Sequence, residues 1–321
     1  MKLKQSLYNT TGVLIILSLL VFSACKKTKE NTTAAITQKE EQPMFFKISL
    51  AQWSLHKKIG SGKMSPFDFA KEANALGFEA IEYVSGLYNK EVKELGIDAV
   101  VERLKAESEK HGVKNLLIMV DGEGNLASHD EDELNSAVEN HKKWVDAAKA
   151  LGCHSIRVNA HGKGTYDEVL EQAVTGLTKL SEYAKTKGIN VLVENHGGFT
   201  SNGKWLATVM EKVTMPNCGT LPDFGNFCIK RKSDGCADEY DKYKGVEELM
   251  PYAKAVSAKS YDFDDQGNDI TIDYTKMLQI VKAAGYTGYI GVEYEGSKLS
   301  ERDGILATKK LLLRVGKELS N

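Results

Sequence analysis

The chain has 321 residues, with 42 Lys and Arg against 44 Asp and Glu, and 42% of its residues are hydrophobic. This composition is that of a folded globular protein and excludes an intrinsically disordered or fibrous chain. The balanced charge excludes a protein held to nucleic acid by a dominant basic surface. The length fits either two modest domains or one large α/β barrel.

The first 24 residues have the features of a bacterial lipoprotein signal peptide. Two lysines precede a mainly apolar run over residues 13–22, and the short stretch after it ends at Cys25. The run is too short for a permanent transmembrane helix, which needs about 20 apolar residues. We therefore expect cleavage before Cys25, lipidation of its thiol, and export to a bacterial membrane, on its periplasmic or surface-facing side. The alternative is a plain secretory signal with an incidental cysteine.

Residues 25–44 are polar and lack a periodic apolar face, which predicts a flexible tether between the lipid and a domain at 45–321. An oxidising compartment outside the cytoplasm permits disulfides. Cys228 and Cys236 are the nearest pair in sequence, but the sequence alone leaves the pairing open. The cysteines beyond the anchor are Cys153, Cys218, Cys228 and Cys236.

From residue 45 onward one sequence pattern recurs. A helical stretch ends in glycine, and a short apolar or β-branched run follows, as in ALG-FEAIEYV around Gly77 and TKG-INVLVEN around Gly188. Glycine just after a helix favours a left-handed stop. The runs are short and almost continuously apolar, which is typical of buried parallel strands.

Eight such strand–helix pairs predict a single (β/α)₈ barrel, an α/β fold for which about 250 residues is typical. The first strand leads into Trp53-Ser-Leu-His56 and not into a glycine fingerprint, which disfavours an open dinucleotide-binding sheet. The expected strands are 46–53, 79–84, 114–121, 154–159, 190–195, 218–223, 254–259 and 289–294. The expected helices are 66–76, 98–111, 131–151, 167–187, 203–213, 238–253, 272–284 and 301–318.

In such barrels the chemistry lies at the carboxyl ends of the strands. Charged side chains at the ends of buried strands cost free energy unless they are paired or bind something. Three carboxylates stand out, because Glu194, Asp223 and Glu293 lie at the ends of the fifth, sixth and eighth strands. Converging carboxylates repel each other, and a divalent cation such as Mn²⁺ or Mg²⁺ relieves that repulsion. The alternative is that each carboxylate pairs separately with a neighbouring Lys or Arg.

The order LVEN, LPDFGN, AKS and GVEYE along the last four strands resembles the xylose-isomerase-like sugar isomerase and epimerase barrels. The resemblance covers the whole region after the tether. In that family a divalent metal is held by Glu, Asp, His and Glu, which implies Glu194, Asp223, a seventh-strand residue and Glu293 as ligands. The chain departs from the family at the seventh strand, where Ser257 replaces the His.

A hydroxyl is a weaker metal ligand than an imidazole, so another group is needed if the site is to match the family's. His196 lies two residues beyond Glu194 and points the same way if the strand continues, which makes it a candidate ligand. Lys259 shares a face with Ser257, and its ammonium could instead neutralise the carboxylates without a metal.

The resemblance implies proton transfer next to the carbonyl of a sugar, through an enediolate that the metal stabilises. Glu194 and Glu293 would exchange the proton from opposite faces of the carbon, with Asp223 a ligand only. Lys259 is the third candidate catalytic residue, and a structural ion pair is its alternative role. The candidate substrate contacts are Trp53, His56, Glu82, Arg157, Asn159, His161 and Ser257.

Three other functions compete with a sugar isomerase or epimerase. Related barrels cleave 3-keto-glycosides by the same proton removal, which suits an enzyme outside the cytoplasm. Loss of the seventh-strand His also suits a non-catalytic carbohydrate-binding lipoprotein. The related DNA-repair endonucleases need a histidine-rich site for three metals, and export removes their substrate. We therefore expect a small sugar or glycoside as partner and no nucleic acid.

Overall fold

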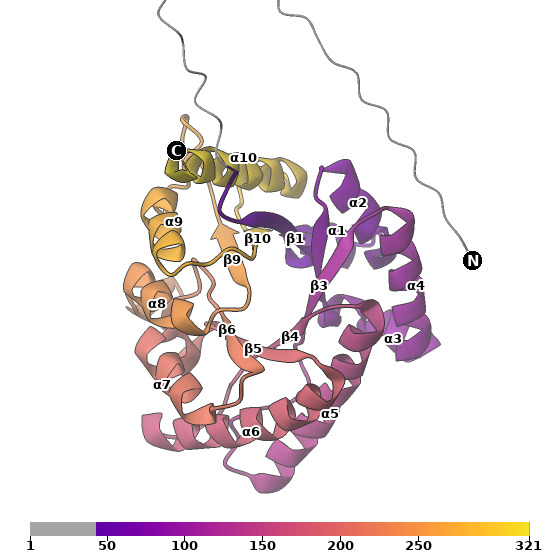
Figure 1. The fold of residues 1–321 in the computed structure, drawn as a ribbon, viewed down its shortest axis with the longest axis vertical. Coiled ribbons are helices and arrows are strands. Elements are labelled where there is room, and N and C mark those ends of the chain that lie inside the picture. The colour runs from indigo at the N-terminus through magenta and orange to yellow at the C-terminus, as the bar shows by residue number, and fades with distance from the viewer. Residues whose placement is uncertain (1–42, 321) are drawn as a thin grey trace, which may run out of the picture. The chain divides into compact units, whose positions relative to one another are not determined.

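Eight parallel strands form one sheet that curls into a barrel surrounded by helices (Figure 1). The computed structural model describes residues 43–320. The predicted signal peptide, Cys25 and almost all of the predicted tether lie outside these residues. The predicted (β/α)₈ barrel is confirmed.

The strand order around the barrel is β6-β5-β4-β3-β2-β1-β10-β9. Two isolated bridges, Thr220 to Ala253 and Asp223 to Ser257, join β6 to the segment of β9 and close the ring. The strands are β1 (Lys47–Ala51), β2 (Ala80–Val84), β3 (Lys114–Met119), β4 (Ser155–Val158), β5 (Asn190–Glu194), β6 (Cys218–Leu221), β9 (Val256–Ser260) and β10 (Tyr289–Tyr294).

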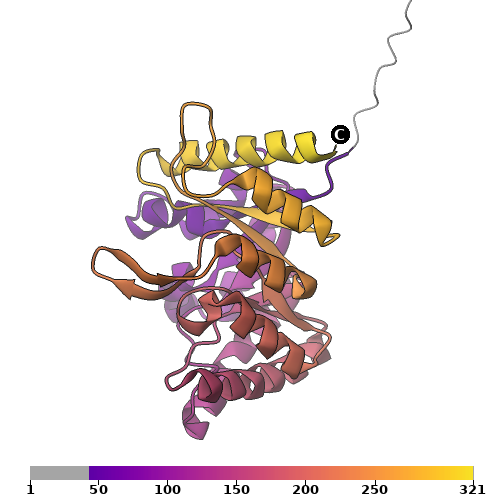
Figure 2. The same cartoon turned by 90° about the vertical axis from the view of Figure 1, so that its left-hand side faces the viewer.

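The helices alternate with the strands and pack on the outside of the barrel (Figures 1 and 2). Positive φ, from 64° to 76°, is found at the five glycines that end helices before a strand, namely Gly77, Gly112, Gly152, Gly188 and Gly285. The α-helices are α1 (His56–Gly60), α2 (Phe69–Ala75), α3 (Asn89–Leu95), α4 (Ile97–Lys110), α5 (Glu131–Leu151), α6 (Tyr166–Lys187), α7 (Gly203–Val213), α8 (Lys242–Leu249), α9 (Tyr274–Ala283) and α10 (Glu301–Ser320).

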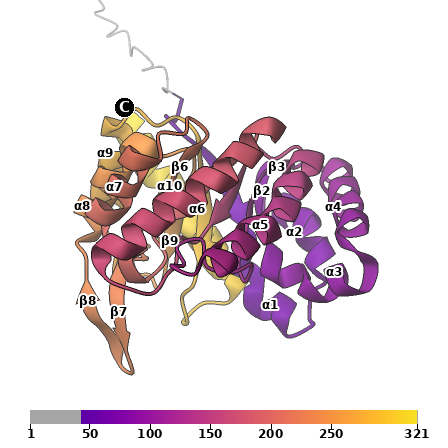
Figure 3. The ribbon, with the colours of Figure 1, turned by 90° about the horizontal axis from the view of Figure 1, so that it is seen from below.

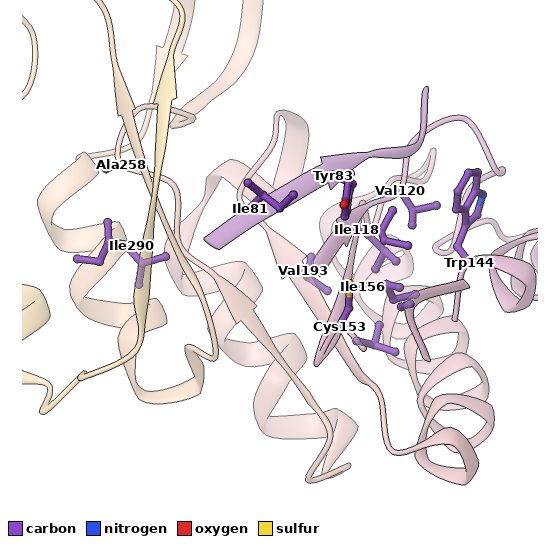
Figure 4. Packing of buried hydrophobic residues seen from close by; sticks show 14 of the residues in the cluster. Ile81, Tyr83, Ile118, Val120, Trp144, Cys153, Ile156, Val193, Ala258 and Ile290 are labelled. Carbon is purple, nitrogen blue, oxygen red and sulfur yellow. The ribbon is translucent and has the colours of Figure 1, made fainter. Parts of the chain in front are cut away.

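Alternate residues of each strand face opposite sides of the sheet, so the barrel has two apolar regions. The larger lies between strands and helices, where Ile118 and Ile156 pack in the same cluster as Trp144 of α5 (Figure 4). The smaller fills part of the barrel interior and comprises Ala51, Val84, Leu117, Met119, Leu192, Leu221 and Ala255. The charged side chains described below share the interior with this smaller group.

One expected element differs from the structure. The helix expected over 238–253 begins at Lys242, and the residues before it form a hairpin of β7 (Cys228–Lys232) and β8 (Gly235–Glu239). The hairpin projects away from the barrel (Figures 2 and 3). Most of its side chains are exposed on both faces, so neither face needs apolar residues. Its sequence therefore lacks the alternation of apolar and polar residues that predicts a strand.

A disulfide joins Cys228 to Cys236 across this hairpin, with the two Cα atoms 5.7 Å apart. An isolated two-stranded hairpin is marginally stable in water, so the covalent link substitutes for a missing apolar face. Cys153 and Cys218 carry free thiols. Among the described residues, no helix is both long and apolar enough to cross a membrane.

Candidate functional site

Three carboxylates from separate strands meet inside the barrel. Glu194 ends β5, Asp223 lies two residues after β6, and Glu293 lies in β10. One oxygen from each lies within 4.8 Å of the others. Their exposed fractions are 2%, 0% and 4%. We call these three residues the carboxylate triad. Because buried charges are costly, each one needs compensating partners.

Glu194 is held by an arginine and an amide. Its Oε2 lies 2.8 Å from Nε of Arg157 in an ion pair that is not aligned as a hydrogen bond. Asn226 Nδ2 donates a hydrogen bond of 3.1 Å to Oε1. Burial raises the pKa of Glu194 to about 7; the Arg157 guanidinium opposes this shift, and neighbouring Glu293 adds to it. Glu194 therefore retains a proton more readily than an exposed glutamate.

Asp223 is fixed through its backbone and its side chain. Its Oδ1 accepts hydrogen bonds of 2.8 Å from the backbone N–H groups of Gly225 and Asn226. The side chain of Asn195 accepts from Asp223 N at 2.7 Å and donates to Asp223 O at 3.0 Å. Burial raises the pKa of Asp223 to about 8, although the Lys259 ammonium opposes the shift.

Ser257, in β9, bridges two members of the triad. Its Oγ lies 2.8 Å from Oδ2 of Asp223 and 3.0 Å from Oε2 of Glu293. A hydroxyl carries one hydrogen and can donate to only one carboxylate at a time. The second contact is favourable only if that carboxyl holds a proton or if a cation lies between the oxygens.

Lys259 is buried against the other side of Glu293. Its Nζ donates to Glu293 Oε1 at 2.7 Å and to Glu295 Oε1 at 3.0 Å, and it lies 3.8 Å from Oδ2 of Asp223. Burial acts to raise the pKa of Glu293, but the ammonium outweighs it and the pKa is lowered. Burial likewise acts to lower the pKa of Lys259, and the surrounding carboxylates raise it instead. Glu293 is thus kept ionised by its lysine.

The residues present fit a divalent cation. The sequence left open whether the carboxylates converge or pair separately with basic residues. In the structure they do both, because Glu194 pairs with Arg157 and Glu293 pairs with Lys259 while the triad still converges. Acidic groups outnumber basic ones, since these two cations face six carboxyl groups, namely Glu82, Asp121, Glu194, Asp223, Glu293 and Glu295. Three carboxylates and the Ser257 hydroxyl form an all-oxygen donor set, which suits Mg²⁺ or Mn²⁺.

Glu82 adds a fourth buried carboxyl to the barrel interior. Ser49 donates to its Oε1 at 2.6 Å, and its Oε2 has no hydrogen-bond partner among the described residues. Burial raises the pKa of Glu82 to about 8. The carboxyl lies against the backbone of Gly291 in β10, where a Cβ would lie 2.7 Å from both of its oxygens. A side chain at 291 would therefore displace the Glu82 carboxyl.

The remaining predicted site residues lie around the barrel mouth. Asn159 donates to Asp121 Oδ1 at 2.7 Å, beside the Arg157 contact to the same oxygen. The rings of half-buried Trp53 and His56 stack with centroids 4.4 Å apart. These positions are compatible with substrate contacts, and their roles stay predictions.

His196 and His161 form a pair outside the triad. His161 Nε2 lies 3.1 Å from the carbonyl oxygen of His196, and the two rings stack. Among the described residues, the group able to share one ion holds Glu194, Asp223 and Glu293 and does not include His196. Partial desolvation, with the nearby Arg157 guanidinium, lowers the pKa of His196 to about 4. The ring is therefore neutral near pH 7.

Sequence reasoning assigned no role to two amides that fix the triad. Asn195 follows Glu194 and holds Asp223, whereas Asn226 follows Asp223 and holds Glu194. The two strand ends are thus tied reciprocally. The signal was present in the motifs LVEN and LPDFGN, where each acid is followed by an asparagine within three residues.

The model of the xylose isomerase-like TIM barrel family matches residues 70–314. The chain belongs to this family. Solved structures with the same fold include the IOLI protein with a bound zinc atom, at 17% identity and a TM-score of 0.65, covering 85% of this chain and 99% of that chain. Another is 3-keto-D-glucoside 4-epimerase, YcjR, from E. coli, at 14% identity and a TM-score of 0.61, covering 83% and 99%.

One sequence relative of this family member is the C-glycoside deglycosidase alpha subunit of Arthrobacter globiformis. The two are 36% identical over 66 residues, which is 20% of this chain and 19% of that protein. The match therefore spans about a fifth of the relative's length. The structural neighbours share less than a fifth of their residues with this chain and establish the fold alone.

Proposed function

We propose that the protein is a divalent-metal-dependent sugar isomerase or epimerase that transfers a proton next to a carbonyl. The observation that carries the proposal is the carboxylate triad, whose oxygens lie within 4.8 Å of one another at the carboxyl ends of three strands. Such a cluster suits a hard cation. Membership of the xylose isomerase-like family and fold neighbours that are sugar epimerases support the choice of substrate class.

The chain's own residues divide the acid and base roles. When bound, a divalent cation would act as a Lewis acid and stabilise negative charge on the substrate oxygens. Glu293, kept ionised by Lys259, is suited to take the proton from carbon. Glu194, whose burial favours the protonated form, is suited to return one. Arg157 positions Glu194, and Lys259 positions Glu293.

A second candidate reaction is cleavage of 3-keto-glycosides by elimination, which begins with the same proton removal. It is favoured by the names of two similar proteins, a 3-keto-D-glucoside 4-epimerase and a C-glycoside deglycosidase subunit. Both names indicate glycosides as substrates of those proteins. Glycosides would also be the more accessible substrates for an exported enzyme.

The lipid anchor and the exported location remain part of the proposal. The disulfide between Cys228 and Cys236 supports them, because structural disulfides persist mainly outside the cytoplasm. In this proposal residues 1–24 are removed, Cys25 is lipidated, and the tether carries the barrel at a membrane surface. Palmitate labelling of the full chain, compared with Cys25→Ala, tests the anchor.

The reaction is tested by exchange of substrate hydrogen with D₂O. The mature protein, loaded with Mn²⁺, is incubated with aldoses, ketoses and 3-keto-glycosides, and deuterium uptake at carbon is measured by NMR. We expect exchange with at least one of these sugars, and a loss of at least about 100-fold in Glu293→Gln. Glu295→Gln is the matched control, because Glu295 contacts the same lysine but lies outside the triad. Sugar binding without exchange would favour the non-catalytic carbohydrate-binding lipoprotein.

A further inference from the structure

A pocket of about 540 Å³ lies at the barrel mouth, between the loop after β5 and the hairpin β7–β8. One wall, residues 196–199, begins two residues after Glu194. The opposite wall, residues 228–231, begins five residues after Asp223. Both walls therefore continue strand ends that carry triad carboxylates, so a substrate held at the triad can extend into this pocket.

The two walls are tied to each other and to the triad by one residue. The carbonyl oxygen of Asn226 accepts hydrogen bonds from Asn195 Nδ2 at 3.2 Å and from Ser201 Oγ at 2.7 Å. The Asn226 side chain donates to Glu194. The hairpin is thus anchored directly beside the reacting groups.

The pocket lining is positively charged and contains no carboxylate. Lys230 and Arg231 contribute two cations, and His161 and His196 contribute imidazoles. Within residues 43–320, neither Lys230 nor Arg231 has an ion-pair partner. The next residue, Lys232, lies outside the lining and pairs with Asp234 at 3.5 Å. Two unpaired cations at the edge of a pocket attract an anionic ligand.

Apolar side chains form the rest of the lining. They are Ala160, Val169, Phe199 and Ile229. Apolar surface combined with cations suits a ring that presents a hydrophobic face and carries an acidic substituent. The disulfide encloses Lys230 and Arg231 in a closed loop, which reduces the conformational freedom that they lose on binding.

We propose that this pocket binds the second ring of a glycoside and that this ring carries a carboxylate. This inference rests on the proposed function. The reacting sugar lies at the triad, and the linked ring lies between Phe199 and the hairpin with its carboxylate at Lys230 and Arg231. Two sources share this chemistry, a uronic acid residue and a carboxylated aromatic aglycone.

The test is calorimetric binding to the mature, Mn²⁺-loaded protein, with two pairs of probes. A glucosyl-glucuronic acid disaccharide is compared with cellobiose, and 4-carboxyphenyl β-glucoside with phenyl β-glucoside. We expect the acidic member of at least one pair to bind about tenfold more tightly, with the preferred pair identifying the source. High salt should remove this preference.

The double variant Lys230→Gln/Arg231→Gln should lose the preference for acidic probes. Its affinity for the neutral probes should stay within about twofold of the wild-type value. Lys232→Gln makes the same change of charge on the same hairpin and should change nothing. Any of three results would overturn the proposal. The wild type could bind acidic and neutral probes equally, or it could bind none of the four probes. The double variant could also lose the same affinity for acidic and for neutral probes.

Binding and turnover separate this proposal from the function on which it rests. If acidic preference is present but no keto sugar exchanges hydrogen with D₂O, the pocket proposal stands and the proposed reaction is wrong. If exchange occurs without acidic preference, the reaction stands and the pocket proposal is wrong. Retained affinity for the neutral probes also shows that the double variant is folded.

Discussion

The carboxylate triad and the hairpin β7–β8, which begins five residues after Asp223, are built in opposite ways. Triad residues are at most 4% exposed, and their oxygens contact Arg157, Lys259, Ser257 and backbone N–H groups. Most of the hairpin is exposed and is held by a disulfide. The triad is fixed by many mutual contacts, whereas the hairpin is fixed by one covalent bond and its anchored base.

This difference assigns separate tasks to the two regions. A buried charge network changes its geometry and stability when any single partner is lost. An exposed loop on a rigid scaffold tolerates substitution and can alter binding without altering the fold. Changes in the triad should therefore affect stability, metal binding and turnover, and changes in the hairpin should affect ligand preference. The following predictions test that division.

The largest expected effect is on stability, in Arg157→Met. Removing the guanidinium leaves Glu194 buried without its counter-ion, which costs about 3–5 kcal/mol in comparable cases. Urea unfolding in the presence of EDTA measures the loss. Arg231→Met removes the same charge from the hairpin and should change the free energy of unfolding by no more than about 0.5 kcal/mol. Similar losses of unfolding free energy in the two variants would contradict the assignment of stability to the triad and ligand preference to the hairpin.

The next effect is on metal affinity, in Asp223→Asn. The amide oxygen can still accept from Gly225 and Asn226, so the fold should persist. Loss of one anionic ligand should weaken Mn²⁺ binding about 100-fold, or about 2.7 kcal/mol, as measured by calorimetry. Asp121→Asn is the control, because Asp121 contacts Arg157 but lies outside the triad. Unchanged Mn²⁺ affinity in Asp223→Asn would remove this residue from the ligand set.

A pH-dependent effect, smaller per pH unit than the expected change in metal affinity, is expected in Glu82→Gln. Burial raises the pKa of Glu82 from 4.5 to about 8, so between these values the folded protein binds a proton that the unfolded chain releases. The wild type therefore loses stability as pH rises through this window, by up to about 1.4 kcal/mol per pH unit from this group. Glutamine does not titrate, so the variant should gain stability relative to wild type from pH 5 to 8.

Chemical unfolding at several pH values measures this difference. Glu79→Gln removes an exposed charge just before the same strand and provides the comparison. A constant difference between Glu82→Gln and wild type across the window would mean that Glu82 is ionised in the folded protein.

The smallest effect on global stability is expected from removal of the hairpin disulfide, in Cys228→Ser/Cys236→Ser. The hairpin contributes little to the core, so the free energy of unfolding should fall by about 1 kcal/mol or less. Trypsin should nevertheless cut after Lys230, Arg231 or Lys232 much faster, because the loop can open locally. Mass spectrometry of the early fragments locates the cuts. Early cleavage within the barrel would show that the two regions unfold together.

The barrel and the triad could be predicted from sequence for a local reason. Five of the eight strands follow a helix-ending glycine, and each triad acid ends a short apolar run, so both signals lie within about ten residues of chain. Carboxyl ends of parallel strands share one side of the barrel, which brings Glu194, Asp223 and Glu293 together once the fold is assigned.

The partners of these acids could not be predicted, because they depend on register between strands. The contact of Arg157 with Glu194 follows from the alignment of β4 with β5, and the bridge by Ser257 follows from the closure of β6 against β9. One missed feature had a local signal, since a glycine inside a strand, such as Gly291, indicates close approach of another group. The hairpin had none, because its residues are exposed on both faces.

The barrel closes where β6 meets the segment of β9 without a continuous strand ladder. Along β6 and β9 the ring is joined by two isolated bridges, and one of them is formed by Asp223 and Ser257 themselves. An ion bound by residues on both sides of this seam would oppose separation of the two strands. A ligand that binds only the closed ring stabilises the closed ring by mass action. Amide protons flanking the seam should therefore exchange more slowly once the site is filled, which makes the integrity of the ring a reporter of its occupancy.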